Sequence, residues 1–178
     1  MILNQNKAFT LVESLITIFI IIALTLIIIP NYNSLRKQLA LQRSAFKLSQ
    51  DIRRVQEMAM SAKEFGGEIP GGGYGISLLS GASYVIFVDQ DSDGKYDDPS
   101  ERVEDDVFLE NGIEIESIDP VQLQTIIFSP PDPEVFFMNS GGEAIINVDE
   151  IMVKIIISGD VSKNMEITIN RAGLIDIE

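Results

Sequence analysis

A long apolar stretch near the N-terminus, FTLVESLITIFIIIALTLIII, constrains this 178-residue chain more than any other feature. It runs over 21 residues, from Phe9 to Ile29, and carries a single charged side chain. At about 1.5 Å per residue it would form a helix of about 31 Å, which matches the hydrocarbon core of a bilayer. A secretory signal has a shorter apolar region followed by a small-residue cleavage pattern, and no such pattern follows here. We therefore expect residues 9–29 to remain as a transmembrane helix.

The charge of the chain is unevenly distributed. Residues 1–65 carry eight basic and four acidic side chains, a net charge of +4, whereas residues 66–178 carry 23 acidic and five basic ones, a net charge of −18. A field of that sign repels nucleic acid and anionic lipid. We therefore expect no nucleic-acid partner for the C-terminal part.

The composition also argues against catalysis. The chain has neither cysteine nor histidine, which excludes thiolate chemistry, zinc sites built on those residues, and Ser-His-Asp or Cys-His mechanisms. The spacing of the acidic residues singles out no pair suited to a hydrolase that uses two carboxylates. We therefore expect a protein that is not an enzyme.

Glu13 is the one charge within the apolar stretch. A carboxylate inside lipid costs a few kcal/mol or more unless it finds a partner. In one interpretation, Glu13 lies one turn into the helix and reaches the interface. In the other, the polar leader MILNQNKA, residues 1–8, is cut off between Ala8 and Phe9, which gives Phe9 a free ammonium group. Phe9 and Glu13 would then be spaced i, i+4, so that opposite charges can meet within a chain or between neighbouring chains.

The segment KAFTLVESLITIFIIIAL resembles the class III signal of type IV pilins and type II secretion pseudopilins. The resemblance implies that a prepilin peptidase cuts before Phe9 on the cytoplasmic side and N-methylates it, and that Glu13 recognises the N-terminus of a neighbouring subunit during assembly. It also implies a single-pass protein of the inner membrane with its N-terminus inside, whereas the flanking basic residues alone leave the orientation undecided. At one position the chain departs from the family pattern, because Ala8 stands where the family usually has glycine.

Residues 30–65 are predicted to continue the helix beyond the membrane. Pro30 removes a helical hydrogen bond and clashes with the preceding turn, so we expect a kink or local unwinding there; the resemblance implies a stretch that melts on filament assembly. Apolar residues then recur at spacings of four and three, and Gly66-Gly67 stands where a C-cap would. This apolar seam consists of Leu41, Ala45, Leu48, Ile52, Val55, Ala59 and Ala62. Within this helix, SQDIRRVQEMAM resembles the GspH/FimT branch of minor pilins and pseudopilins.

Residues 66–178 are predicted to form a globular domain rich in β-strands. The runs YGISLL, SYVIFVD, RVEDDVFL, GIEIES, VQLQTIIF, EVFFM, EAIINV, IMVKIII and NMEITIN alternate with turn signals. The glycine-rich segment GGEIPGGGYG that precedes them is predicted to be a flexible linker. We expect an α+β fold, in which a mostly antiparallel sheet lies against the C-terminal half of the long helix. The ending MEITINRAGLIDIE again resembles the GspH/FimT branch.

The segment DQDSDGKYDD, residues 89–98, is the strongest candidate for a chemical site. Four acids and a glycine occupy positions 1, 3, 5, 9 and 6 of an oxygen-rich calcium loop: Asp89, Asp91, Asp93, Asp97 and Gly94. Position 12 of an EF-hand is occupied by Ser100, with Glu101 one residue late, and the flanks are typical of strands, as in the hairpin calcium loops of integrin-type domains. The sequence therefore predicts a Ca²⁺ site at these four aspartates. A solvated acidic hairpin is the alternative, because Asp-Gly is a favourable turn.

The leading functional hypothesis is a minor pilin or pseudopilin of the GspH/FimT type. Such a structural subunit would assemble through its N-terminal helix into a type II secretion pseudopilus or a type IV pilus, with its globular domain in the periplasm or outside the cell. Its partners would be the prepilin peptidase, other pilin or pseudopilin subunits and the inner membrane. The alternative is a membrane-tethered calcium-binding or adhesion module that keeps its leader and never polymerises. The signal and the helix are common to both filament systems, so they do not separate pseudopilus from pilus.

Overall fold

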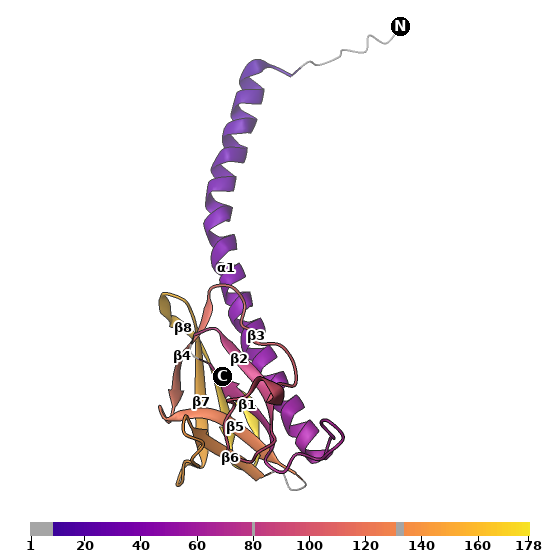
Figure 1. The fold of residues 1–178 in the computed structure, drawn as a ribbon. Coiled ribbons are helices and arrows are strands. Elements are labelled where there is room, and N and C mark those ends of the chain that lie inside the picture. The colour runs from indigo at the N-terminus through magenta and orange to yellow at the C-terminus, as the bar shows by residue number, and fades with distance from the viewer. Residues whose placement is uncertain (1–8, 80, 131–133) are drawn as a thin grey trace. The chain divides into compact units, whose positions relative to one another are not determined.

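A computed structural model describes residues 9–79, 81–130 and 134–178, with the backbone alone for residues 29–31 (Figure 1). The chain divides into two units, Met1–Lys37 and Gln38–Glu178. The predicted leader, residues 1–8, lies outside the described residues. One helix, α1, extends over 50 residues from Leu11 to Met60 and so belongs to both units. Its backbone is helical through Pro30, and unwinding at this residue on assembly stays a prediction.

Helix α1 ends earlier than the sequence pattern predicts. The N–H of Lys63 donates to the carbonyl of Met58 at 3.1 Å, and the N–H of Ala62 donates to that of Ala59 at 2.9 Å. Ala62 adopts a left-handed conformation, with φ of 45°. These are the features of a Schellman motif, so the helix ends at Met60 and Gly66 is not its cap.

The rest of the second unit forms two sheets, where the sequence predicts one. The first sheet has the order β3-β2-β1-β5-β6 and the second has the order β4-β7-β8-β9, and every pairing within them is antiparallel. The strands are β1 (Gly73–Leu78), β2 (Ser83–Asp89), β3 (Val107–Phe108), β4 (Ile113–Asp119), β5 (Leu123–Ser129), β6 (Glu134–Asn139), β7 (Glu150–Ile157), β8 (Asp160–Asn170) and β9 (Ile175–Ile177). Two sheets result because β4 pairs with β7 and does not pair with β5, the next strand in the chain.

The main core lies between α1 and the two sheets. Six of the seven predicted seam residues are buried, and Ala62, beyond the end of the helix, is only half-buried. Their spacing places them on one face of the helix, which is why a single apolar cluster joins them to strand residues of both sheets. The buried seam residues are Leu41, Ala45, Leu48, Ile52, Val55 and Ala59.

Strand β2 is buried on both faces. Alternate residues such as Tyr84 and Ile86 belong to the main core, whereas Val85 and Phe87 belong to a smaller cluster on the opposite face of the sheet. Tyr96, from the acidic segment after β2, covers this smaller cluster, with its ring centroid 5.7 Å from that of Phe87. Part of the acidic segment is therefore packed against the sheet.

Three segments differ from the predicted pattern. RVEDDVFL contributes only the short strand β3, and EAIINV forms no strand, although it is bridged to β6 at Ala144. Ile146 is exposed and Asn147 takes a positive φ of 66°, which interrupts an extended run. The glycine-rich segment is more ordered than a flexible linker, because Phe65 and Glu68 form a bridged turn and Gly73 begins β1.

Candidate functional site

The helix of the N-terminal unit begins with Thr10 as its capping residue. The N–H of Glu13 donates to Thr10 Oγ1 at 3.2 Å, and the N–H of Ser14 donates to the Thr10 carbonyl at 3.1 Å. Glu13 therefore lies in the first turn of α1, where a carboxylate is favoured by the helix dipole. This gives Glu13 a local role in addition to the assembly role that the resemblance implies.

The predicted cleavage position is described on one side only. Ala8 lies outside the described residues. Phe9 precedes the helix, which begins at Leu11, and its side chain is 75% exposed. In the chain with its leader, Phe9 and Glu13 therefore do not share a helix face, and their pairing after cleavage stays a prediction.

The apolar stretch is an exposed helix that meets the requirements of a membrane span. Its most apolar 18-residue window has a mean hydropathy of 2.8, and none of the described residues in it is buried in the protein. Two hydroxyl groups within it are satisfied by their own helix: Thr17 Oγ1 donates to the Ser14 carbonyl at 2.8 Å, and Thr25 Oγ1 donates to the Ile21 carbonyl at 2.7 Å. Hydrogen bonds of this kind allow polar side chains to enter lipid without unsatisfied groups.

Asp89, the last residue of β2, is the buried anchor of the acidic segment. Its Oδ1 accepts a hydrogen bond from the Asp93 N–H at 3.1 Å, and its Oδ2 accepts one from the Gly94 N–H at 3.2 Å. The carboxylate fills the space that a Cβ on Gly72 would need, and the residue is 3% exposed. The glycine-rich segment and the acidic segment therefore hold Asp89 between them.

Lys95 neutralises two of the predicted calcium ligands. Its Nζ lies 2.6 Å from Asp93 Oδ2 and 2.7 Å from Asp97 Oδ2, and hydrogen bonds to these carboxylates raise the pKa of Lys95. Asp91, Asp93 and Asp97 do offer oxygens within 4.8 Å of one another. The Lys95 ammonium group already offsets the negative charge of two of these carboxylates, so a metal ion would lower the repulsion among the three by less.

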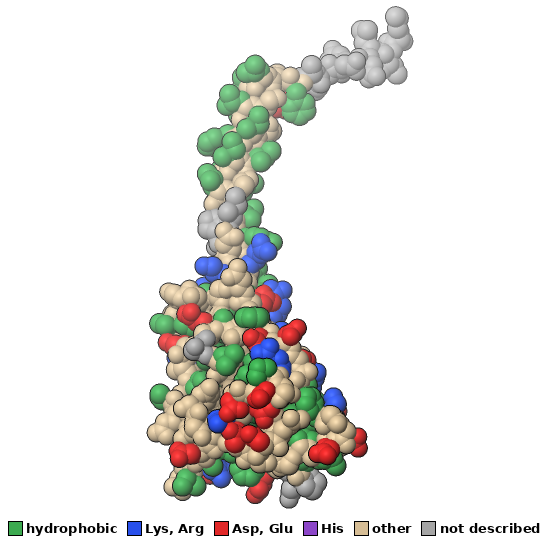
Figure 2. All heavy atoms as spheres, viewed as in Figure 1, with side chains coloured by type: hydrophobic (Ala, Val, Ile, Leu, Met, Phe, Trp, Pro, Cys, Tyr) green, Lys and Arg blue, Asp and Glu red, His purple; other side chains and the backbone are tan. Residues whose placement is uncertain are grey.

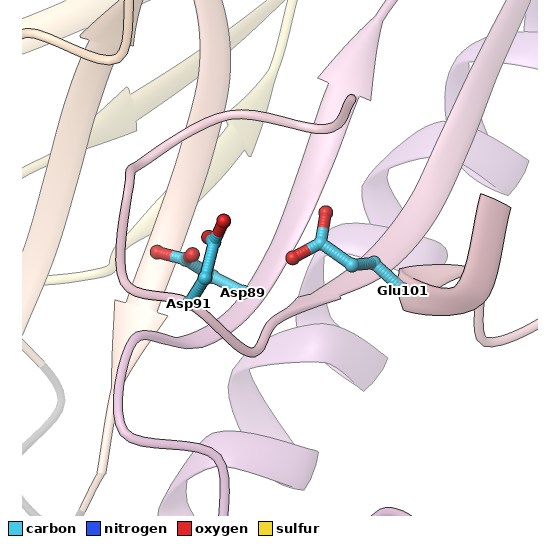
Figure 3. A group of neighbouring side chains, drawn as sticks. All are labelled: Asp89, Asp91 and Glu101. Carbon is cyan, nitrogen blue, oxygen red and sulfur yellow. The ribbon is translucent and has the colours of Figure 1, made fainter. Parts of the chain in front are cut away.

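A second cluster of carboxylates forms around Glu101. Asp89, Asp91 and Glu101 each offer an oxygen, and the three oxygens lie within 4.8 Å of one another. Figure 3 shows the Glu101 carboxylate pointing from the 3₁₀ helix toward the two aspartates. Its Oε1 accepts a hydrogen bond from the Gln90 N–H at 3.1 Å. Its Oε2 is buried and has no hydrogen-bond partner among the described residues.

The position of Glu101 is fixed by local backbone structure. It ends the 3₁₀ helix η1 (Pro99–Glu101), which Asp98 caps by accepting a hydrogen bond from the Ser100 N–H at 2.7 Å. Pro99 supplies a φ suited to the first helical position.

Burial raises the pKa of both Asp89 and Glu101, and the charges of neighbouring aspartates raise both pKa values further. Acidic side chains gather on one face of this unit, as Figure 2 shows.

Comparison with solved structures finds a similar architecture. The chain is similar to the crystal structure of the type IV minor pilin FimU of Pseudomonas aeruginosa (strain PAO1), with a TM-score of 0.50 and 13% sequence identity, over 78% of this chain and 87% of that one. The chain has a pilin fold. Comparison with protein families and with curated proteins finds no match. At this identity the likeness concerns the fold, which is the predicted α+β architecture of a long N-terminal helix on antiparallel sheets.

Within this pilin fold, the predicted calcium ligands fall into two groups. Asp89 and Asp91 converge with Glu101, whereas Asp93 and Asp97 share Lys95. Glu101 was not among the predicted ligands, because it stands one residue past position 12 of an EF-hand loop. The sequence Asp-Pro-Ser-Glu, residues 98–101, could have indicated Glu101 as a ligand. It forms a capped 3₁₀ turn that directs the chain back toward the start of the loop.

Proposed function

We propose that the protein is a minor pilin or pseudopilin, a structural subunit that assembles through its N-terminal helix into a type IV pilus or a type II secretion pseudopilus. The observation that carries the proposal is the combination of a pilin fold in one unit with an exposed apolar helix in the other. An apolar surface of this length needs lipid or other helices to cover it. A membrane covers it before assembly, and the corresponding helices of other subunits cover it in the filament.

Glu13 gives this assembly its charge pairing. Once the leader is cut between Ala8 and Phe9, the new ammonium group of one subunit lies within a filament core of low dielectric constant. A lone charge there is costly, whereas a charge with an opposite partner is far less so. The Glu13 carboxylate of a neighbouring subunit supplies that partner, which sets the axial register between the two helices.

The proposal includes the partners and location that go with this mechanism. The prepilin peptidase cuts the chain and N-methylates Phe9 while the subunit is a single-pass protein of the inner membrane, with its N-terminus in the cytoplasm. The globular unit then faces the periplasm or, in a filament, the exterior. The chain acts by contact with other subunits and performs no catalysis. The resemblance of the ending MEITINRAGLIDIE to the GspH/FimT branch supports a minor subunit in this proposal.

Mass spectrometry of the N-terminal peptide from native membranes tests the processing step. We expect a peptide that begins with N-methylated Phe9, and we expect the leader to persist when the prepilin peptidase is deleted. A chain that begins at Met1 in the presence of the peptidase would refute the proposal. It would favour a membrane-tethered calcium-binding or adhesion module that never polymerises.

Substitution at Glu13 tests the assembly step separately. Glu13→Gln keeps the shape of the side chain and removes its charge, so we expect normal cleavage but a fall of about tenfold or more in the fraction found in sheared filaments, the equivalent of about 1.4 kcal/mol. Thr17→Val is the matched control, because it changes a neighbouring polar side chain whose hydroxyl donates to the Ser14 carbonyl of its own helix. Equal incorporation of the Glu13→Gln variant and the control would argue against charge pairing.

A further inference from the structure

Three carboxylates of the acidic face have the spacing of a metal site. The oxygens offered by Asp89, Asp91 and Glu101 lie within 4.8 Å of one another. Calcium binds oxygen at about 2.3–2.6 Å, so one ion can bridge oxygens that lie up to about 5 Å apart. Asp89 and Glu101 are each 3% exposed, and Asp91 lies at the surface. A cation bound here would therefore be covered on one side and open to water on the other.

The basic side chains nearest in sequence are engaged with other groups. Lys95 pairs with Asp93 and Asp97. Arg102 lies 3.0 Å from Asp106 Oδ1 and donates to the Tyr96 hydroxyl at 2.8 and 3.1 Å. Neither of these cations therefore offsets the charge of the three carboxylates.

Glu101 provides a second, independent observation that points to a metal ion. Its carboxylate points toward Asp89 and Asp91 (Figure 3), and its buried Oε2 has no hydrogen-bond partner in the described part of the chain. A backbone interaction with the Asp97 N–H lowers the pKa of Glu101, but no donor among the described residues has hydrogen-bond geometry to Oε2. A buried carboxylate oxygen without a partner is costly, and a metal ion would remove that cost.

We propose that Asp89, Asp91 and Glu101 bind a calcium ion. Oxygen donors of this kind suit calcium, which takes six to eight ligands in a flexible geometry, and water would complete the shell. The ion would tie the end of β2 to the 3₁₀ helix η1. This site differs from the four-aspartate loop that the sequence predicts, because Glu101 replaces Asp93 and Asp97.

The test uses the full chain, purified in detergent and freed of metal with a chelator. Calcium binding is followed by isothermal titration calorimetry and by the midpoint of thermal unfolding. We expect a dissociation constant on the order of 10⁻⁴ to 10⁻³ M, as in extracellular calcium modules, and a rise in the midpoint of several degrees at about 10 mM calcium. Magnesium at the same concentration should have a smaller effect, because it demands a stricter geometry.

Three variants distinguish the proposed site from the loop predicted from sequence. Glu101→Gln and Asp91→Asn should each weaken calcium binding by about tenfold or more, since each removes a charged ligand. Asp91 is exposed, so its variant is expected to fold even if the change at Glu101 disturbs the core. Asp97→Asn is the matched control and should change the affinity by less than about threefold, because the Asp97 carboxylate pairs with Lys95.

Several outcomes would overturn the proposal. One is the absence of both binding heat and a thermal shift when calcium is added to the wild-type chain. Another is an equal response to magnesium, because an equal response would indicate general screening of the acidic surface. A loss in Asp97→Asn as large as that in Glu101→Gln would transfer the site to the other carboxylates. None of these outcomes bears on cleavage before Phe9 or on filament assembly, so the calcium site and the proposed function can fail separately.

Discussion

Tyr84 on β2 forms a part-buried polar contact between the sheet and the helix. Its side chain has no exposed surface, and its hydroxyl donates a hydrogen bond to Asp51 Oδ2 of α1 at 2.5 Å. Burial raises the pKa of Tyr84 well above its ordinary value of 10, and the Asp51 carboxylate raises it further. The pKa is therefore higher in the folded chain than in the unfolded one. Its contribution to stability is complete below pH 10 and decreases as the pH rises above that value.

Tyr84→Phe tests this contact. At pH 7 we expect the free energy of unfolding to fall by about 1–3 kcal/mol, because a buried hydrogen bond to a charged group is lost. Between pH 9 and about pH 11 the stability of the variant should decrease less steeply than that of the wild type, because the linked proton is absent. Urea unfolding of the detergent-solubilised chain across this range gives both quantities. Tyr32→Phe, at an exposed position, is the control, and parallel pH curves for wild type and Tyr84→Phe would contradict the argument.

At the scale of secondary-structure elements, the C-terminus of α1 shows how a local motif can override a composition signal. Gly66-Gly67 is the obvious stop signal, yet the helix ends in a Schellman motif around Ala62. An L-residue in the left-handed region costs about 1–2 kcal/mol relative to glycine. A hydrogen bond offsets part of this cost. The Tyr74 hydroxyl of β1 donates to the Lys63 carbonyl at 2.6 Å, which connects the end of the helix to the first strand.

Ala62→Gly should stabilise the protein. Removal of the Cβ relieves the left-handed strain, and the greater freedom of glycine in the unfolded chain cancels part of the gain. The net expectation is an increase in the free energy of unfolding of about 0.5–1 kcal/mol, measured by urea unfolding. Ala62→Val, which adds a β-branched side chain at the same φ, should instead be destabilising. A loss of stability in Ala62→Gly would mean that this turn is not left-handed in solution.

At the scale of the whole molecule, the charge asymmetry of the chain is partly neutralised by contacts within the second unit. Arg43 of α1 lies 2.9 Å from Glu110, and Arg54 lies 2.9 Å from Glu104. Both pairs are solvent-exposed, so each contributes at most about 1 kcal/mol. They nevertheless occupy two basic side chains of the helix and leave the surface of this unit with a strong excess of acids.

This charge distribution predicts that the chain does not bind DNA. With a net charge of −18 on residues 66–178, fluorescence anisotropy of a labelled duplex should stay unchanged on addition of the chain in detergent, even at low salt. The double variant Arg36→Ala, Lys37→Ala serves as a control for weak contacts made by the basic residues that follow the apolar stretch. Salt-dependent binding that persists in this variant would contradict the prediction.

The features that depend on local patterns could be predicted from the sequence alone. The buried seam of α1 follows from hydrophobic periodicity, the apolar stretch from its length and composition, and the strands β1 and β2 from short apolar runs between turn signals. One segment carries each of these signals without reference to the rest of the chain. The same holds for the α+β class, because a long helical pattern is followed by short β-rich runs. The acidic segment could likewise be recognised as a candidate site from its spacing alone.

The features that depend on which segments meet follow from the folded arrangement of the chain. It divided the strands into two sheets, because β4 finds its partner in β7, and it joined the turn that ends α1 to β1 through the hydrogen bond from the Tyr74 hydroxyl to the Lys63 carbonyl. It also separated the acidic residues into two groups, because Lys95 folds back on Asp93 and Asp97 while η1 brings Glu101 to Asp89 and Asp91. Spacing along the chain shows which side chains could converge, but the folded backbone and the competing cations decide which of them do.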